Sequence, residues 1–431
     1  MRTIFNNEKV VKACKIVQML QNQPPHLSFH TPGHKAVGWD ITELGYSDNL
    51  ASPIGCIAEA EKDIADILGA KKSFILTDGS TSGVLSMLYA AKSLGAKRIL
   101  TSENAHKSVF NGCAVLGLEL LLYPSKTSKK IPLPHTMYAL KRDFSTFLEE
   151  ADALLFTSPD YYGNVADLAE IRAYCTQMGK MLLIDGAHGG HLHFHKDIYA
   201  GTYADIWVDG VHKNLPALTQ GAVVSARSEK FAEALQKGVD IFRTTSPSYP
   251  IMASVEYAVK YPQNTKLEAL AQDFLSHPRV YPSKDWTKIC AIFGNHAFQV
   301  EKILQSEGIY AEFCDGNVLM FYLSPVTDVA DFEKLRSRLL ALFAEFPLLD
   351  KEENAEKERV ELTEGAVEWL PLDEAVGAVS GGFCGLFPPC TPLICRGEII
   401  TDEKIRLLKE ATHTFGLKNG KIAVWKGAKK E

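Results

Sequence analysis

The sequence lacks the features that mark membrane, secreted and nucleic-acid-binding proteins. None of its apolar runs approaches the roughly 18 residues that a membrane-spanning helix needs, so we expect no membrane segment. The first residues, 1–8, are too polar for a secretory signal. A net charge of -6 and the absence of a basic stripe argue against a nucleic-acid partner.

Cysteine is present, but not in a pattern that predicts disulfides or a zinc site. The nine cysteines are an odd number and contain no Cys-x-x-Cys pair. The closest group, Cys384, Cys390 and Cys395, matches no common zinc spacing, so we predict no metal. Scattered reduced thiols are typical of a cytosolic protein, and we therefore expect a cytoplasmic location.

Strands and helices alternate through the first half of the chain. The apolar runs that we interpret as strands are 73–77, 98–101, 118–123, 153–157, 181–185, 206–208 and 221–225. Helical segments between them, such as 84–94 and 167–178, imply a mostly parallel sheet covered on both faces, which is an α/β fold. Polar residues collect just after the strands, where open α/β sheets bind ligands.

The pattern changes on either side of that region. An amphipathic segment at 7–21 predicts one helical stretch. Beyond about residue 261 helical segments predominate, 289–307 among them, and the charged run 351–361 is expected to be a solvated loop or helix face. The predicted division is a helical arm at 1–27, a large α/β domain at 28–262 and a smaller α+β domain at 263–431.

A lysine after one predicted strand is a candidate for a buried, reactive amine. The run 206–208 leads into a polar turn with His212 and Lys213 at its tip, and the apolar residues 215–218 follow. Burial disfavours the ammonium and lowers the lysine pKa, which makes the amine a nucleophile able to form a Schiff base. Taken alone, the pattern is also typical of an exposed loop lysine.

A turn rich in glycine, serine and threonine separates an earlier predicted strand from its helix. The segment 78–83 has neither the Gly-Lys-Ser/Thr of a Walker loop nor a Gly-x-Gly-x-x-Gly motif. Backbone amides at a helix N-terminus, with the hydroxyls of Ser80, Thr81 and Ser82, can hold an anion. The alternative interpretation is a simple helix cap.

The anion turn, His106, Asp185 and Lys213 all follow strands of one predicted sheet. One chemical explanation covers them, a site for pyridoxal phosphate (PLP). The phosphate needs an anion cradle, which 79–81 supply, and the aldehyde needs an amine, which is Lys213. Asp185 would keep the pyridine nitrogen protonated through a charge-assisted hydrogen bond, and His106 could stack on the ring.

The order of motifs resembles the ornithine/lysine/arginine decarboxylases, which are PLP enzymes of the aminotransferase-like fold (fold type I). The matching stretches are 31–35, 40–43, 59–61, 78–83, 104–108, 158–163, 185–190, 212–220 and 245–249. They occur in family order over residues 28–260. Looser matches follow at 372–377 and 388–392, and the chain resembles a short form without the N-terminal wing domain of the large bacterial enzymes.

The resemblance implies a fold type I large domain with a mostly parallel seven-stranded sheet, plus a smaller α+β domain. It implies that Lys213 is the Schiff-base lysine, Asp185 the pyridinium partner and His106 the stacking group. Further cofactor contacts are implied for Gly79, Ser80, Thr81, Ala187 and His212, and, reaching the neighbouring subunit's site, for Ser246 and Ser248. Such enzymes are dimers or larger, with sites at the interface.

The chain departs from the family pattern at several positions. Gly210 stands where the family usually has serine, so one phosphate hydroxyl is missing. Glu103 stands where an arginine is usual. Ala378 and Gly382 replace the arginine and glutamate of a C-terminal motif, and 387–392 differs from the usual Tyr-Pro-Pro-Gly-Ile-Pro.

Histidines and charged residues near the predicted site carry further hypotheses. We expect His188 to lie near the cofactor and to act in catalysis. Alternation of His191, His193 and His195 along a strand would align three imidazoles as a possible metal site, but we favour positions at the site mouth or in solvent.

Substrate-binding candidates come from several parts of the chain. Acidic loop residues could bind a cationic substrate tail, and Arg396 could anchor a carboxylate as transaminases of this fold require. The candidates are His34, Lys35, Asp160, Tyr161 and Arg396, with Glu43 and Asp48 as further acidic residues.

We therefore predict a PLP-dependent amino acid decarboxylase that releases CO2 and leaves the amine. Arginine, lysine or ornithine is the expected substrate, polyamine biosynthesis the expected context and a homodimer or larger the expected assembly. Lys213 or His188 would return a proton to Cα. The alternatives are an aminotransferase or another lyase of the same fold, or a non-catalytic PLP-binding relative, against which the presence of both Lys213 and Asp185 argues.

Overall fold

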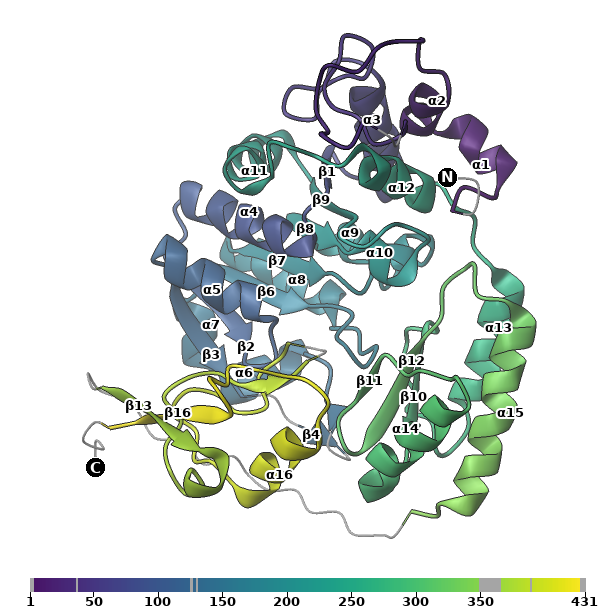
Figure 1. Cartoon of the computed structure of the whole chain (residues 1–431). Coiled ribbons are helices and arrows are strands. Elements are labelled where there is room, and N and C mark those ends of the chain that lie inside the picture. Colours follow the sequence, from purple (N-terminus) through teal and green to yellow (C-terminus); the bar gives the residue numbers. More distant parts are fainter. Residues whose placement is uncertain are drawn as a thin grey trace.

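The computed structural model describes residues 4–35, 38–124, 127–128, 131–348, 366–387 and 390–426 (Figure 1). The charged run predicted at 351–361 lies outside the described residues, as do the prolines at 388–389. Nowhere in the described ranges does a helix have the length and apolar character needed to cross a membrane.

A seven-stranded sheet in the order β1-β9-β8-β7-β6-β2-β3 forms the centre of the larger α/β part. All its strands run parallel except β9, which is antiparallel to both neighbours. The strands are β1 (Lys72–Leu76), β2 (Arg98–Ser102), β3 (Glu119–Tyr123), β6 (Ala153–Thr157), β7 (Met181–Gly186), β8 (Ile206–Asp209) and β9 (Ala222–Ala226). The predicted seven-stranded, mostly parallel sheet is confirmed.

Helices cover both faces of this sheet, which explains why its strands are continuous apolar runs. Along β7, Leu183 packs into one core and its neighbours Leu182 and Ile184 into the other. The Leu183 side is covered by α4 (Ser80–Ser93), α5 (Lys107–Leu116) and α11 (Glu229–Phe242). The opposite side is covered by α2 (Lys15–Gln21), α3 (Cys56–Leu68), α8 (Leu168–Met178) and α12 (Tyr249–Val259).

The N-terminal segment forms two short helices where the sequence predicts one. Helix α1 (Glu8–Ala13) ends at Cys14, whose backbone is extended, and α2 begins immediately after it. The fully buried carboxylate of Glu256 on α12 accepts hydrogen bonds from the N–H groups of Lys15 (2.7 Å) and Ile16 (2.8 Å). A side chain more than 200 positions away therefore caps α2, and periodicity in the sequence cannot reveal such a contact.

A second, antiparallel sheet in the order β10-β12-β11 belongs to the C-terminal half. Its strands are β10 (Lys288–Ile292), β11 (Phe313–Cys314) and β12 (Val318–Tyr322), packed with α13 (Thr265–Leu275), α14 (Ala297–Ser306) and α15 (Val329–Glu345). The helix predicted at 289–307 is wrong in its first part, because that stretch is the buried strand β10. A short apolar run that is buried on both faces has no period that separates strand from helix.

The remaining C-terminal elements lie beside the larger sheet (Figure 1). They are β13 (Val367–Pro371), which pairs with β16 (Lys421–Trp425), β14 (Gly385–Leu386), which pairs with β15 (Thr414–Phe415), and α16 (Asp402–Glu410). Their apolar side chains share a core with Phe313 and Met320 of the second sheet and with Tyr161. The division at 262/263 stays a prediction.

Short elements complete the connections between these larger ones. They are α6 (Met137–Asp143), α7 (Ser145–Glu150), α9 (Ala200–Tyr203), α10 (Val211–Asn214), β4 (Thr127–Ser128), β5 (Ile131–Pro132), η1 (Gly190–Phe194), η2 (Gly294–His296) and η3 (Leu372–Glu374). Of these, α10 and η1 matter for the site, since each directly follows the end of a central strand.

Glu256→Ala should detach the start of α2 from α12. The N–H groups of Lys15 and of the buried Ile16 lose their acceptor, so we expect the free energy of unfolding to fall by about 2 kcal/mol, measured by urea denaturation. The control is Glu59→Ala, which removes the exposed partner of the Lys15 ammonium. That loss should cost about 0–1 kcal/mol. Equal losses in the two variants would contradict the capping role.

Candidate active site

A cavity of about 760 Å³ lies at the carboxyl-terminal edge of the parallel strands. Its sheet-side wall comes from the segments that follow β1, β2, β6, β7 and β8. Its opposite wall comes from the C-terminal half, including Phe313, Asp315 and residues 391–393 and 398–407. The size is that of a small-molecule or cofactor site.

Most of the predicted site residues meet in this cavity. Those that line it are Gly79, Ser80, Thr81, His106, Asp160, Tyr161, Asp185, Ala187, His188, His212 and Lys213. Those that do not are His34, Lys35, Ser246, Ser248 and Arg396.

Lys213 lies on α10, a single helical turn that begins two residues after β8. Burial lowers the pKa of Lys213 to about 8, although the nearby Asp185 carboxylate acts in the opposite direction. Its Nζ lies 2.9 Å from Nε2 of His188. The unprotonated fraction of this amine at neutral pH is therefore much larger than that of an ordinary lysine, as a nucleophilic lysine requires.

Asp185 is the second-last residue of β7 and is 2 % exposed. Strands β7 and β8 are neighbours in the sheet, which brings Asp185 and Lys213 to the same edge. Burial raises the pKa of Asp185, while the Lys213 ammonium and a 3.1 Å hydrogen bond from the Ala187 N–H lower it. A buried carboxylate of this kind is stabilised by a cation, and a protonated pyridine nitrogen supplies one.

The anion turn is built more tightly than the sequence predicts. Helix α4 begins at Ser80, not at residue 84, so the three hydroxyls of Ser80, Thr81 and Ser82 belong to its first turn. Gly79 before it has φ +84°, a conformation that favours glycine. Its N–H is donated to the carbonyl of Gln220 (2.9 Å).

Ser80 shows what kind of ligand this turn can take. Its hydroxyl lines the cavity, is buried and has no hydrogen-bond partner within the described structure. The first N–H groups of α4 also have no acceptor within their own helix. An unpartnered buried hydroxyl beside a positive helix end fits a phosphate group.

His106 and His212 have fixed orientations around the cavity. His106 is the N-cap of α5, and its Nδ1 accepts a hydrogen bond from the Ser108 N–H at 3.2 Å. Burial lowers its pKa to about 4, so the ring that lines the cavity is neutral. His212 Nδ1 donates to the carbonyl of Gly221 at 2.9 Å, and burial lowers its pKa. A phosphate dianion at Nε2 would favour protonation of that ring.

The structure explains why residue 210 is glycine. A Cβ at this position would lie 2.2 Å from the Ala187 carbonyl oxygen and 2.9 Å from Ser80 Oγ. The φ of Gly210 is -83°, so close approach rather than backbone conformation requires the glycine. A side chain at position 210 would therefore overlap the segment that follows β7.

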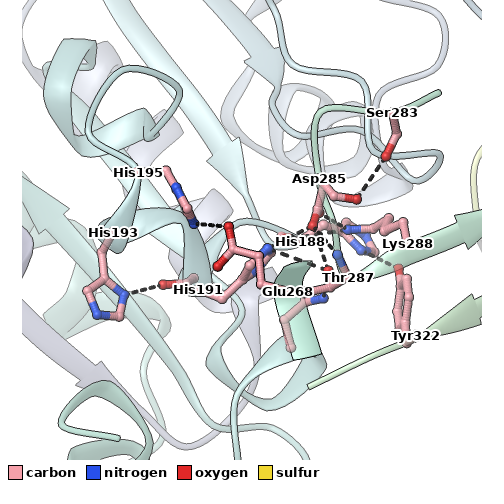
Figure 2. A network of polar contacts seen from close by, with 12 residues as sticks. His188, His191, His193, His195, Glu268, Ser283, Asp285, Thr287, Lys288 and Tyr322 are labelled. Atoms are coloured by element: carbon pink, nitrogen blue, oxygen red, sulfur yellow. Dashed lines mark hydrogen bonds and ion pairs between the residues drawn. The ribbon is translucent and has the colours of Figure 1, made fainter. Parts of the chain in front are cut away.

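His188 links the cavity to the second sheet. Its Nδ1 lies 2.6 Å from the hydroxyl of Tyr322, the last residue of β12, and burial lowers the pKa of the ring well below its ordinary value. The Lys288 ammonium donates to the His188 carbonyl at 3.3 Å. Figure 2 shows these side chains converging from β10 and β12 on the segment after β7.

A fully buried ion pair holds that segment. Lys288 Nζ lies 2.7 Å from Asp285 Oδ2, and Asp285 Oδ1 lies 2.8 Å from His191 Nε2. Although burial alone would raise it, the neighbouring His191 and Lys288 side chains hold the pKa of Asp285 well below its usual range. Sequence reasoning missed Asp285, Lys288 and Tyr322, which lie roughly 100 or more positions from His188 and His191 and form no recognisable motif with them.

The histidines after β7 do not form the strand face that would align them. Residues 190–194 are a 3-10 helix, so successive rings diverge (Figure 2). His191 contacts Asp285, His193 Nδ1 donates to the Gly190 carbonyl at 2.7 Å, and His195 lies 3.2 Å from Glu268. His191 and His193 are buried, so the expectation that they line the site mouth or face solvent is wrong. Within the described ranges, no cluster of histidine, cysteine and acidic side chains could hold a metal ion.

Several substrate candidates have other partners. Both carboxylate oxygens of Asp160 accept hydrogen bonds from Asn164, and burial raises the pKa of Asp160 to about 6. Arg396 is exposed, lies 5.6 Å from the Trp425 ring centroid and does not line this cavity, so its role as a carboxylate anchor stays a prediction. Asp48 does not line the cavity. Burial acts to raise the pKa of Asp48, but hydrogen bonds from backbone N–H groups lower it below its usual value. His34 contacts Asp40 at 3.1 Å.

The wall opposite the sheet is acidic, which sequence reasoning did not foresee. Asp315, Glu398 and Glu403 line it. Asp315 is held by the Val318 N–H (2.7 Å) and the Tyr162 hydroxyl (2.8 Å), and burial raises its pKa. Asp315 lies in the β11–β12 hairpin, Glu398 in the segment before α16 and Glu403 on α16, so no local motif in the sequence connects them.

A family model for the Orn/Lys/Arg decarboxylase major domain matches residues 17–281. The chain belongs to the Orn/Lys/Arg decarboxylase family. The family model covers all five strand ends that form the sheet-side wall of the cavity. The expected fold type I architecture is confirmed by the sheet and by this membership.

Curated relatives of similar length cover nearly the whole chain. The uncharacterized protein YaaO of Bacillus subtilis is 27% identical over 90% of this chain and 92% of its own length. An arginine decarboxylase of the same organism is 25% identical over 88% and 89%. The constitutive lysine decarboxylase of Escherichia coli is 30% identical, but over 52% of this chain and 33% of its own length.

Solved structures share the fold at low identity. A lysine decarboxylase of Francisella novicida superposes with a TM-score of 0.71 at 18% identity, covering 96% of this chain and 80% of its own. An SPT structure with PLP superposes with a TM-score of 0.51 at 15% identity, covering 68% and 77%. The common architecture is therefore that of family members and of a more distant PLP enzyme.

Gly210→Ser, which restores the usual family residue, should disturb the site instead of adding a phosphate contact. The new Cβ would overlap the Ala187 carbonyl, so we expect a loss of about 1–3 kcal/mol in stability together with weaker PLP binding. Thermal unfolding and PLP titration measure the two effects. Gly382→Ser is the control, because the nearest atom to its Cβ is 3.6 Å away. Tighter PLP binding by Gly210→Ser would contradict the packing explanation.

Proposed function

We propose that this protein is a PLP-dependent decarboxylase of a basic amino acid (arginine, lysine or ornithine), with Lys213 as the residue that binds the cofactor. The observation that carries the proposal is a buried lysine of lowered pKa beside Asp185, at the cavity of a chain that belongs to the Orn/Lys/Arg decarboxylase family. The relatives named arginine decarboxylase and lysine decarboxylase support a basic substrate.

The chemistry that PLP supplies when bound is withdrawal of electrons from the Cα–carboxylate bond into a protonated pyridine ring. In this chain, Asp185 would hold the proton on the pyridine nitrogen. Ser80, the first turn of α4 and His212 would hold the phosphate. His106 would cover one ring face and exclude water from it. The neutral state of His106 suits that role, since a cationic ring there would oppose the pyridinium charge.

Lys213 would have two tasks in this proposal. As the free amine it would hold the cofactor covalently, and as the ammonium it would supply a proton at Cα of the substrate. A pKa of about 8 makes both protonation states accessible near neutral pH. His188 lies within hydrogen-bond distance of Nζ and would orient the amine.

The acidic wall opposite the sheet supports a cationic substrate side chain. Asp315, Glu398 and Glu403 face the same cavity as Lys213, so an amino acid held near Lys213 would extend a basic tail toward carboxylates. Glu398 is paired with Lys404, whereas the described partners of the Asp315 carboxylate are neutral donors. Asp315 is therefore the residue that we assign to recognition of the basic group.

We also propose a homodimer or larger assembly in the cytoplasm, acting in polyamine biosynthesis. Ser246, Ser248, His34 and Lys35 do not line their own cavity, which is compatible with a contribution to the site of a second subunit. Leu27, Phe29 and Ile54 near them in sequence are highly exposed apolar side chains, at 83%, 92% and 92%. A second copy would remove such side chains from water.

PLP should become covalently attached to Lys213. Borohydride reduction of the PLP-loaded protein, followed by peptide mass spectrometry, should find the pyridoxyl group on that residue, and Lys213→Ala should abolish the labelling. Only the neutral amine attacks the aldehyde, so the rate of capture should rise as the pH passes upward through about 8. Lys71→Ala, which changes an exposed lysine paired with Glu229, should label normally. Absence of label from the wild-type chain would refute PLP attachment.

Asp315→Asn should weaken recognition of basic amino acids. Loss of a charged hydrogen bond is worth about 1.5–3 kcal/mol, so KM for the best of arginine, lysine and ornithine should rise roughly 10- to 100-fold in a CO2-release assay. Glu410→Gln, on α16 but outside the cavity, should leave KM unchanged. An unchanged KM in Asp315→Asn would show that another group binds the tail.

A further inference from the structure

Lys213 lies in a helical turn that is too short to hold its own shape. Helix α10 has 4 residues, and two hydrogen bonds close it. The Lys213 N–H donates to the Gly210 carbonyl at 3.1 Å, and the Leu215 N–H donates to the Val211 carbonyl at 3.0 Å. Because isolated helices shorter than about 12–15 residues are marginal in water, contacts from outside must fix this turn.

The two residues that flank Lys213 supply such contacts. On one side, the N–H and Nδ1 of His212 donate to the carbonyl of Gly221, just before β9, at 3.0 and 2.9 Å. On the other side, Asn214 Nδ2 donates to Thr287 Oγ1 at 2.8 Å. Thr287 directly precedes β10, and both of these side chains are buried. The turn is therefore tied both to the large sheet and to the C-terminal half.

Asp285 sets the direction of the hydrogen bond between Asn214 and Thr287. Thr287 Oγ1 lies 2.6 Å from Asp285 Oδ1. An ionised carboxylate only accepts, so the hydroxyl proton of Thr287 points at Asp285. The Thr287 oxygen then has only lone pairs to offer, and Asn214 must present its amide N–H. In agreement, Asn214 Oδ1 is buried and has no hydrogen-bond partner among the described residues.

The same carboxylate also holds His188, which lies at the Lys213 amine. Asp285 Oδ2 lies 2.7 Å from Lys288 Nζ, which donates to the His188 carbonyl at 3.3 Å. Asp285 Oδ1 lies 2.8 Å from Nε2 of His191 in η1. Figure 2 shows these side chains gathered around Asp285. The start of β10 therefore fixes both the segment that bears Lys213 and the segment that bears His188.

We propose that Thr287 is a positioning residue for Lys213, because through Asn214 it fixes the turn that presents the amine to His188 and to the cavity. The proposal rests on the cofactor-binding role of Lys213 proposed above. Thr287 does not line the cavity, so it acts only through its neighbours. Without the Asn214 contact, the single turn can shift and the amine can leave His188 for the open cavity.

The position of the amine has a measurable consequence. Burial is the largest cause of the lowered pKa of Lys213, so a looser turn, which lets more water reach the ammonium, should raise that pKa. Changes at Thr287 and Asn214 alter no charge, so a shift would report a change in position. The charged and titratable groups that act on the amine, all of them retained, are Asp185, Glu312, Lys288, Cys390, His106, His188 and His212.

Thr287→Val tests the proposal, because it removes the hydroxyl and keeps the shape of the side chain. In the protein without PLP, acetic anhydride would label Lys213, and peptide mass spectrometry would measure the rate. The pH at which this rate is half-maximal should rise by about one unit. Thr287→Ser keeps the hydroxyl and should retain the wild-type value.

Thr327→Val is the matched control in the C-terminal half. It removes a hydroxyl that accepts a hydrogen bond from the Ser324 N–H at 2.9 Å. We expect it to lower the melting temperature without moving the half-maximal pH of Lys213. A purely structural role of Thr287 would give the same result in Thr287→Val.

Asn214→Ala removes the same contact from the other end and leaves the hydrogen bond between Thr287 and Asp285 in place. It should raise the half-maximal pH as Thr287→Val does, and the double variant should rise no further, because both changes remove one interaction. PLP capture at pH 7 should slow about tenfold in each variant and approach the wild-type rate at high pH, since one unit of pKa changes the free amine about tenfold.

An unshifted or lowered half-maximal pH in either folded variant would overturn the proposal. Acetylation needs neither PLP nor substrate, so this result is independent of the proposed function. Failure of the wild-type chain to trap PLP on Lys213 would instead refute the cofactor-binding role, and the acetylation curves would still decide whether Thr287 positions the amine.

Discussion

Burial of the Lys213 amine beside the Asp185 carboxylate is the interaction on which the rest of the site depends. Each charge would be costly if it were buried alone, because the low-dielectric interior penalises an unpaired ion. Together they keep the lysine pKa near 8 and leave a carboxylate that suits a cationic ring. This pairing requires β7 and β8 to be parallel neighbours, since their carboxyl ends must meet at one edge of the sheet.

The second sheet supports this pair from the other side. Tyr322 on β12 and Lys288 on β10 hold the side chain and the carbonyl of His188, and Asp285 ties the start of β10 to η1. Apart from His191 Nδ1, the buried polar side chains named here have hydrogen-bond partners, which is the condition under which such a network confers one arrangement instead of costing stability. The position of the imidazole against Lys213 therefore depends on residues about 100 or more positions further along the chain.

Close packing also explains how this chain departs from its family while retaining the site. At position 210 the serine usual in the family has no room, because the Ala187 carbonyl occupies the space of its Cβ. The unpartnered hydroxyl of Ser80 and the free N–H groups of α4 remain for the phosphate. The glycine at position 210 therefore alters the packing beside Ser80 and leaves the hydrogen-bond donors at the start of α4 in place.

The sequence by itself determined the strand order along the chain, the anion turn and the candidates Lys213, Asp185 and His106, because each rests on local periodicity or on a short motif. It failed where the signal was not local. The cap of α2 comes from Glu256, the buried run at 288–292 has no diagnostic period, and η1 turned the expected histidine alternation into diverging rings. Only the tertiary structure decided that Tyr322 and Lys288 contact His188 beside Lys213, and that Gly210 has no room for a side chain. Such facts are distances between residues far apart in the chain, and packing of the whole fold sets those distances.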